Sequence, residues 1–206
     1  MIKGHYAQAD TEFLHGLEVL QKYKDVPNMV ESTQISKNYF LLGNINQCKK
    51  YLEIAQSCLE KETYPLSKAI DMYLIAEIFE LLGEFESAKT ACQQSLDWFL
   101  ANAEDAEELV FVAEARLIMG KILVDMGEHQ DAIEYLEKAK TAFEICQHYA
   151  LGETLLYLGK AHVGLGGVIL RRQGKEYVTQ ALAEFERLEL AHKASEAREL
   201  LKGLMS

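Results

Sequence analysis

Small and large apolar residues recur among polar ones at helical spacing, and the same pattern returns four times along the chain. The pattern begins at each of four glycines, Gly4, Gly43, Gly83 and Gly127. A small residue follows five positions after the glycine, a larger apolar residue nine positions after it, and another small residue twelve positions after it. Intervals of 39, 40 and 44 residues separate the glycines. A period of roughly 20–50 residues indicates stacked structural repeats. The three positions hold Ala9, Cys48, Ala88 and Ala132, then Phe13, Leu52, Cys92 and Leu136, then Gly16, Ala55, Ser95 and Ala139.

A matching pattern precedes the glycines and completes a helix hairpin. Seven residues before Gly43, Gly83 and Gly127 lies a small residue, which follows a large apolar one. Gly166 fits the same frame, with Leu158, Gly159 and His162 upstream. We expect the small residues to let two helices approach closely, and each glycine to end the first helix with a positive φ. The upstream pairs are Ile35-Ser36, Ile75-Ala76 and Met119-Gly120, and Tyr39, Phe79 and Leu123 lie four residues before the glycines.

This pattern resembles the tetratricopeptide repeat, a helix-turn-helix unit of about 34 residues. The resemblance rests on Leu158-Gly159 in a first helix, on residues 127–132 at a turn and on Ala139 in a second helix, and it extends from Gly4 to Gly166. The repeats here are longer than the usual form, and they lack its tryptophan near the start of the first helix and its proline after the second. Longer repeats of this kind are similar to those of bacterial regulators with large ATPase-and-repeat tails and of peptide-sensing quorum receptors. The resemblance implies an all-α fold, a right-handed α-α superhelix of antiparallel hairpins whose first helices line a concave groove.

The pattern predicts one tetratricopeptide-like domain over residues 1–206. Its parts are a partial repeat at 1–25, full repeats at 26–62, 63–102 and 103–147, an interrupted repeat at 148–190 and a C-terminal capping helix at 191–206. The expected helices span 5–24, then 26–42 with 45–61, 65–82 with 85–100, 105–126 with 129–146, 149–165 with 176–190, and finally 193–204. Pro27 and Pro65, the two prolines of the chain, precede expected helices, where a missing N–H is tolerated.

Two features leave alternatives open. Because Gly4 is already a turn glycine, the chain begins in mid-repeat, and we expect it to be a piece of a longer protein rather than a natural start capped by its opening helix. After Gly166, we expect the next small packing residue at Ala181, fifteen residues on instead of five. The added stretch is either a functional loop or, as we favour, a lengthened first helix with its turn displaced to Gly174. It is not a phosphate loop, since Ile169 and Glu176 occupy positions where that motif needs glycine and Ser or Thr.

Composition and charge narrow the function classes. With 21 Lys and Arg against 32 Asp and Glu, the net charge is −11, which disfavours direct binding of nucleic acid. No apolar run reaches the roughly 20 residues of a membrane span, and no secretory signal precedes the repeats. The acidic run at 104–108 is expected to cap a helix. The four cysteines and six histidines show no metal-ligand spacing, and Cys48 and Cys92 are expected to be buried thiols of a cytoplasmic protein. We expect no cofactor, no metal and no catalysis, although residues distant in sequence could still form an active site.

The resemblance places candidate binding residues on the outward side of the first helices. One row, Lys37, Glu77, Lys121 and Lys160, carries three lysines that would receive an acidic or carboxylate-bearing peptide, or would be ordinary solvated side chains. The asparagines of the family's carboxylate clamp are missing from this row. The candidate residues are Lys37, Phe40, Tyr73, Glu77, Leu117, Lys121, Leu156 and Lys160, with Thr33, Glu80, Val124 and Val163 on the same faces.

Three functions fit these observations. The first is a non-catalytic protein- or peptide-binding scaffold, within a larger regulatory protein. The second is a sensor or oligomerisation segment of a signalling or transcriptional regulator, which includes a homodimer. The third is an enzyme, for which no motif argues.

Overall fold

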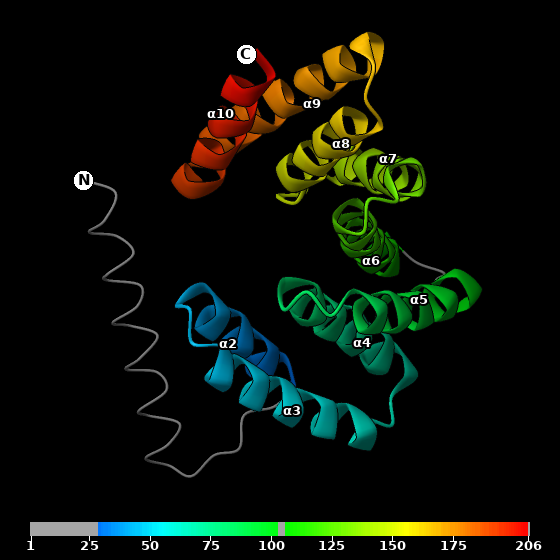
Figure 1. Cartoon of the computed structure of the whole chain (residues 1–206). Coiled ribbons are helices and arrows are strands. Elements are labelled where there is room, and N and C mark those ends of the chain that lie inside the picture. Colours follow the sequence, from blue (N-terminus) through cyan, green and yellow to red (C-terminus); the bar gives the residue numbers. More distant parts are fainter. Residues whose placement is uncertain (1–28, 103–105, 206) are drawn as a thin grey trace. The chain divides into compact units, whose positions relative to one another are not determined.

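The computed structural model describes residues 29–102 and 106–205, and these residues form nine α-helices (Figure 1). The predicted helix at 5–24 and the turn glycine Gly4 lie outside the described residues. The helices form antiparallel pairs in chain order, so the all-α prediction is confirmed. They are α2 Met29–Leu41, α3 Ile45–Lys61, α4 Pro65–Leu81, α5 Phe85–Asn102, α6 Ala106–Asp125, α7 His129–Cys146, α8 Leu151–Leu165, α9 Val168–Arg187 and α10 Ala191–Met205.

The chain forms two compact units, residues 1–58 and residues 59–206. In the first unit, Ser36 of α2 lies against α3, where its hydroxyl donates a hydrogen bond of 2.7 Å to the carbonyl of Cys48. Tyr39 stacks on Tyr51 with ring centroids 5.6 Å apart. A small polar residue therefore marks the close approach of these two helices, at the position that the sequence pattern assigns to it.

In the second unit, three hairpins follow one another: α4 with α5, α6 with α7, and α8 with α9. Small residues again lie where paired helices meet. Ser95 is fully buried and its hydroxyl donates to the carbonyl of Ala69 at 2.7 Å. A Cβ added to Gly120 would lie 2.4 Å from the side chain of Leu136, so only glycine allows this approach of α6 and α7. The buried thiol of Cys92 contacts the carbonyl of Ala115 at 3.2 Å, and both Cys48 and Cys92 are free and buried, as predicted.

The predicted turn glycines end their helices as expected. Gly43, Gly83 and Gly127 have φ of +73°, +74° and +80°, a region that L side chains rarely adopt. The residue after each glycine donates its N–H back across the turn, as from Glu128 to the carbonyl of Leu123 at 2.8 Å. This is the Schellman pattern, which satisfies carbonyls that the helix end would leave without donors.

The fourth hairpin differs from both expectations. Gly166 and Gly167 both have positive φ and end α8, and α9 then runs without interruption from Val168 to Arg187. Gly174 lies inside α9, where an added Cβ would be 2.8 Å from the carbonyl oxygen of Gly159 in α8. Gly174 is therefore the small residue equivalent to Ala132, eight positions after its turn glycine instead of five.

The prediction of a loop and the prediction of a displaced turn at Gly174 are both wrong for this hairpin. Its second helix simply contains three more residues before its packing positions than the second helix of the preceding hairpin. Val178, Ala181 and Phe185 then occupy the packing positions of Leu136, Ala139 and Phe143, and all are buried. Helix α10 packs on α9 through Ala194, Ala197 and Leu201, which form a cluster with Phe185.

Candidate functional site

The first helices of the three hairpins in the second unit, α4, α6 and α8, contact one another directly. Charged and aromatic side chains connect them along one face, which we call the first-helix face. It comprises two polar groups, one centred on Glu114 and the other on Lys121. Each group draws on residues from several helices, so the stacking of the repeats assembles it.

The Glu114 site combines a carboxylate with three aromatic rings. The hydroxyl of Tyr73 on α4 donates to Glu114 Oε2 at 2.7 Å, and His148 Nε2, in the connection before α8, lies 3.7 Å from Oε1. The backbone N–H of Ala150 donates to His148 Nδ1, so the neutral ring carries its proton on Nε2, toward Glu114. Tyr149 is 65% exposed, and its ring centroid lies 4.3 Å from that of His148.

The tyrosine pKa values report the negative charge at this site. Burial raises the pKa of Tyr149, and the charges of Glu114, Glu77 and Glu153 raise it further. Burial also raises the pKa of Tyr73 far above its ordinary value, and Glu114 adds to the effect. Among the described residues, the only ion-pair partner within 4.0 Å of Glu114 is His148, which is charged only when protonated. Within the described part of the chain, therefore, no Lys or Arg offsets the charge of the Glu114 carboxylate.

The Lys121 cluster is the opposite case, a buried cation surrounded by carboxylates. Its Nζ lies 3.4 Å from Glu77, 3.7 Å from Glu80 and 3.1 Å from Glu153, so the lysine of α6 connects α4 with α8. Burial alone would lower the pKa of Lys121, but these three carboxylates outweigh burial and raise that pKa well above its ordinary value. Lys193 on α10 in turn pairs with Glu153, which continues the chain of charges to the last helix.

Two of the three acidic partners of Lys121, Glu153 and Glu80, differ in their own acidity. Burial would raise the pKa of Glu153, but Lys121 and Lys193 lower it to about 2. Burial raises the pKa of Glu80 to about 7. Lys121 lowers this pKa only in part, and the nearby Asp125 carboxyl raises it further. Glu80 is 6% exposed, and its Oε2 accepts no hydrogen bond among the described residues. It is the least satisfied charge of the cluster.

The structure corrects the predicted exposure of the candidate binding residues. Among the eight candidate residues, Tyr73, Leu117, Lys121 and Leu156 are buried, and Thr33, Glu80 and Val124 on the same faces are buried as well. Lys37 and Phe40 are half-buried on α2 in the first unit, and Glu77 and Lys160 are half-buried in the second. Tyr73 and Lys121 are buried because side chains of neighbouring first helices contact them, and Leu156 packs in a cluster with residues of α9 and α10.

The lysine row is likewise not a set of free cations. Lys121 is neutralised by its three carboxylates, and Lys160 pairs with Glu196 at 2.8 Å while lying 4.3 Å from the ring centroid of Tyr157. Carboxylates also outnumber lysines on the first-helix face: Glu77, Glu80, Glu114, Asp125, Glu153 and Glu196 against Lys121, Lys160 and Lys193. The face is acidic, which the sequence reasoning did not predict.

The repeat period of the sequence indicates which polar residues of different helices contact each other. Several interhelical polar pairs join residues about one repeat apart, with separations of 41, 39 and 40 residues for Tyr73 with Glu114, Lys89 with Glu128, and Tyr177 with Glu137. Glu153 and Lys193 are also 40 residues apart. Complementary residue types at one-period spacing would have indicated that the row positions face one another.

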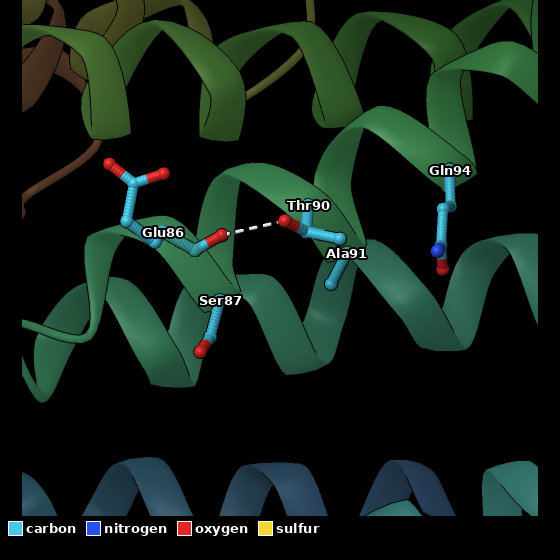
Figure 2. Close-up of a pocket in the computed structure, with 5 residues that line it drawn as sticks. All are labelled: Glu86, Ser87, Thr90, Ala91 and Gln94. Atoms are coloured by element: carbon cyan, nitrogen blue, oxygen red, sulfur yellow. Dashed lines mark hydrogen bonds between the residues drawn. The ribbon is translucent and has the colours of Figure 1, made fainter.

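Other surface features offer less chemistry. Figure 2 shows a depression of about 400 Å³ lined by Glu86, Ser87, Thr90, Ala91 and Gln94, all of them from α5. The Thr90 hydroxyl there donates to the Glu86 carbonyl within the same helix, at 2.8 Å. A second depression of about 340 Å³ lies between α7 and α9, and its lining includes Lys140, Glu144 and Tyr177. Neither combines a carboxylate that lacks a described Lys or Arg partner with an exposed aromatic ring, as Glu114 and Tyr149 do.

The described residues contain no group of three His, Cys, Asp or Glu placed to hold a metal ion. Within the same residues, no helix is both long and apolar enough to cross a membrane.

Comparison with known proteins identifies the repeats. Residues 72–102 and 113–144 match the tetratricopeptide repeat family. These segments are tetratricopeptide repeats. The predicted family and all-α fold are therefore confirmed, and the Glu114 site and the Lys121 cluster draw on both matched repeats and on the hairpin that follows them. No curated protein sequence matched the chain significantly.

Solved structures share the repeat fold at low sequence identity. Aspartyl phosphate phosphatase F from Bacillus subtilis is 16% identical with a TM-score of 0.67, and the match covers 91% of this chain and 49% of that one. A Rap protein in complex with competence and sporulation factor is 18% identical with a TM-score of 0.73, over 91% and 52% of the two chains. Repeats of a kinesin light chain from Podosopora anserina are 15% identical with a TM-score of 0.61, over 90% and 92%. The chain described here thus spans about half the length of the first two proteins.

Proposed function

We propose that the chain is a non-catalytic scaffold that binds a protein or peptide segment on the first-helix face, with a basic side chain of the ligand at Glu114. One observation carries this proposal: the Glu114 carboxylate is partly exposed and contacts Tyr73 and His148, and no described Lys or Arg lies within ion-pair distance of it. A lysine or arginine of the ligand would supply the missing positive charge through a charge-assisted hydrogen bond. Tyr149 would add a cation–π contact with its exposed ring.

The repeat family and one structural neighbour support a peptide ligand. Stacked helical repeats present extended binding surfaces, and a Rap protein with the same fold was solved in complex with competence and sporulation factor. By this analogy, the chain would act as the sensor or scaffold part of a larger regulatory protein. The expected cytoplasmic location belongs to the same proposal.

The charges of the first-helix face favour a basic ligand over the acidic one that the lysine row suggested. An acidic peptide would need Lys121 or Lys160 as its partner. Lys121 is 4% exposed and already contacts three carboxylates, and Lys160 is paired with Glu196. A carboxylate entering here would therefore meet net negative charge, which costs free energy instead of providing it.

An array of short peptides that differ only in carrying Lys and Arg or Asp and Glu tests this proposal. We expect the protein to retain basic peptides, and Glu114→Gln to weaken binding of the best of them by roughly ten-fold or more, since hydrogen bonds to charged groups contribute about 1.5–3 kcal/mol. The amide oxygen of the variant still accepts from Tyr73, so the fold is kept. Glu134→Gln, an exposed carboxylate on α7, is the matched control and should bind normally. Preference for acidic peptides, or equal binding by the Glu114 variant, would contradict the proposal.

A further inference from the structure

The turn between α8 and α9 exposes aliphatic side chains beside positive charge. Val168 is 87% exposed and Ile169 is 75% exposed, and Leu165 across the two glycines is 37% exposed. Arg171, Arg172 and Lys175 follow, all exposed. Residues 165–175, which we call the α8–α9 tip, contain no acidic residue, although the whole chain has a net charge of −11.

The α4–α5 and α6–α7 turns lack this combination, whereas the α2–α3 turn in the first unit also exposes aliphatic side chains, those of Leu41, Leu42 and Ile45. The residues after Gly43, Gly83 and Gly127 are Asn44, Glu84 and Glu128, which are polar or acidic. At the α8–α9 tip, Gly167 follows Gly166 instead, and the three added residues carry the first turn of α9 beyond its packing positions. Val168 and Ile169 are therefore not part of the core, although Gly174 at the end of the tip packs on α8, and these two aliphatic side chains cost solvation without stabilising the fold.

Little within the chain neutralises the positive charges of the tip. Arg172 Nε lies 3.2 Å from Glu176, but both side chains are mostly exposed, and exposed pairs one turn apart interact weakly. Arg171 and Lys175 have no ion pair among the described residues. The tip thus presents an aliphatic surface with adjacent cations to a partner.

We propose that the α8–α9 tip of one molecule docks on the first-helix face of a second copy, with Arg171 or Arg172 at Glu114 and with Val168 and Ile169 against Tyr149. This rests on the proposed function, because it uses the same Glu114 site and names this chain as one source of the basic segment. Both surfaces are present on one chain and complement each other: aliphatic with basic on the tip, aromatic with acidic on the face. An anionic lipid surface would also attract the tip, but it would repel the remainder of so acidic a chain.

This contact joins two different surfaces, so it is heterologous, and a dimer still offers one free tip and one free face. The assembly should therefore grow with concentration beyond a dimer. It should also weaken as salt is raised, because the charges of the tip are exposed and screened.

Sedimentation velocity over a concentration series, with two complementary variants, tests the proposal. The tip variant carries Arg171→Glu and Arg172→Glu, and the face variant carries Glu114→Gln. We expect the unchanged protein to associate, each variant alone to lose association by at least about ten-fold, and an equimolar mixture of the two to form a dimer that grows no further. The dimer forms because the intact tip of the face variant can still dock on the intact face of the tip variant. Lys138→Glu with Lys202→Glu, two exposed lysines elsewhere, matches the charge change and should associate normally.

The possible failures are distinguishable. A protein that stays monomeric but binds basic peptides through Glu114 overturns the docking and leaves the proposed function intact. A protein that does neither overturns both. Association that survives in the tip variant, or a mixture that stays monomeric, overturns the docking in favour of another interface. Binding of the monomer to phosphatidylserine-containing vesicles through Arg171 and Arg172, without self-association, also overturns it and assigns the tip to lipid.

Discussion

Replacing Glu80 by glutamine should stabilise the protein at neutral and alkaline pH, although Glu80 lies within ion-pair distance of Lys121. Its pKa is raised from 4.5 to about 7 because burial opposes ionisation more than Lys121 favours it. Below about pH 4.5 the group is protonated in both the folded and the unfolded chain, so the pKa difference costs nothing there. As the pH rises from 4.5 to 7, the unfolded chain releases this proton while the folded chain retains it, and stability is lost.

The pKa values give the size of this loss. A change from 4.5 to about 7, at about 1.4 kcal/mol for each factor of ten in acidity, corresponds to about 3 kcal/mol above pH 7. Glutamine has nearly the same shape and no charge to bury. Lys121 keeps the closer carboxylates of Glu77 and Glu153, at 3.4 and 3.1 Å. We therefore expect Glu80→Gln to be more stable than the unchanged protein by about 1–3 kcal/mol near pH 8, and close to it near pH 4.5.

Urea unfolding followed by circular dichroism at several pH values measures this difference directly. Glu153→Gln is the matched control, because the same chemical change should have the opposite sign. The pKa of Glu153 is depressed from 4.5 to about 2, so its contribution to stability is present above pH 4.5 and is lost as the pH falls toward 2. The control should be destabilised near pH 8 by about 1–3 kcal/mol. If Glu80→Gln were also less stable than the unchanged protein near pH 8, attraction to Lys121 would exceed the cost of burial and the reasoning would be wrong.

Two further substitutions test the packing of the repeats. Lys121→Met should lower the free energy of unfolding by about 3–5 kcal/mol, since it leaves three carboxylates around a buried methionine. Adding Glu77→Gln and Glu153→Gln to this variant should recover most of that loss. If the single variant were as stable as the triple variant, these charges would not interact. Ala132→Leu should lower it by about 1–3 kcal/mol because Ala132 is fully buried between α6 and α7, whereas Ala183→Leu on the exposed side of α9 should change it by less than about 0.5 kcal/mol. Thermal or urea unfolding measures both, and equal stability of the two alanine variants would refute the assigned packing positions.

The sequence was sufficient to predict most of the helix pairs. Turn glycines and small residues act within a single hairpin, where the partner helix is the next one along the chain, so their spacing indicates the contact. The predicted helices at 45–61 and 129–146 coincide with α3 and α7. The fourth hairpin was mispredicted because Gly174, as the small packing residue, was interpreted as a turn. A glycine inside a helix and a glycine that ends a helix differ in φ, and the residue type alone does not reveal φ.

The first-helix face was harder to predict because its contacts join different repeats. Lys121 looked solvent-exposed from its own helix, yet its environment is set by Glu77 on α4 and Glu153 on α8. The Glu114 site likewise depends on Tyr73 of an earlier helix and on His148 in a later connection. Neither group can be predicted from the sequence of a single helix. Each can be predicted only when residues one repeat apart are compared for complementary charge or hydrogen bonding.

The difference between these two polar groups is why we propose a basic ligand where the lysine row predicts an acidic one. A charged side chain can attract a ligand only to the extent that its own surroundings leave its charge uncompensated. Three carboxylates surround Lys121, and Glu196 pairs with Lys160, so neither lysine offers net positive charge. Glu114 receives a hydrogen bond from a neutral hydroxyl, which orients the carboxylate without cancelling its charge. The buried lysine thus stabilises the contact between repeats, while the carboxylate beside the exposed Tyr149 remains available for a cation, and this is the physical basis for expecting a basic ligand.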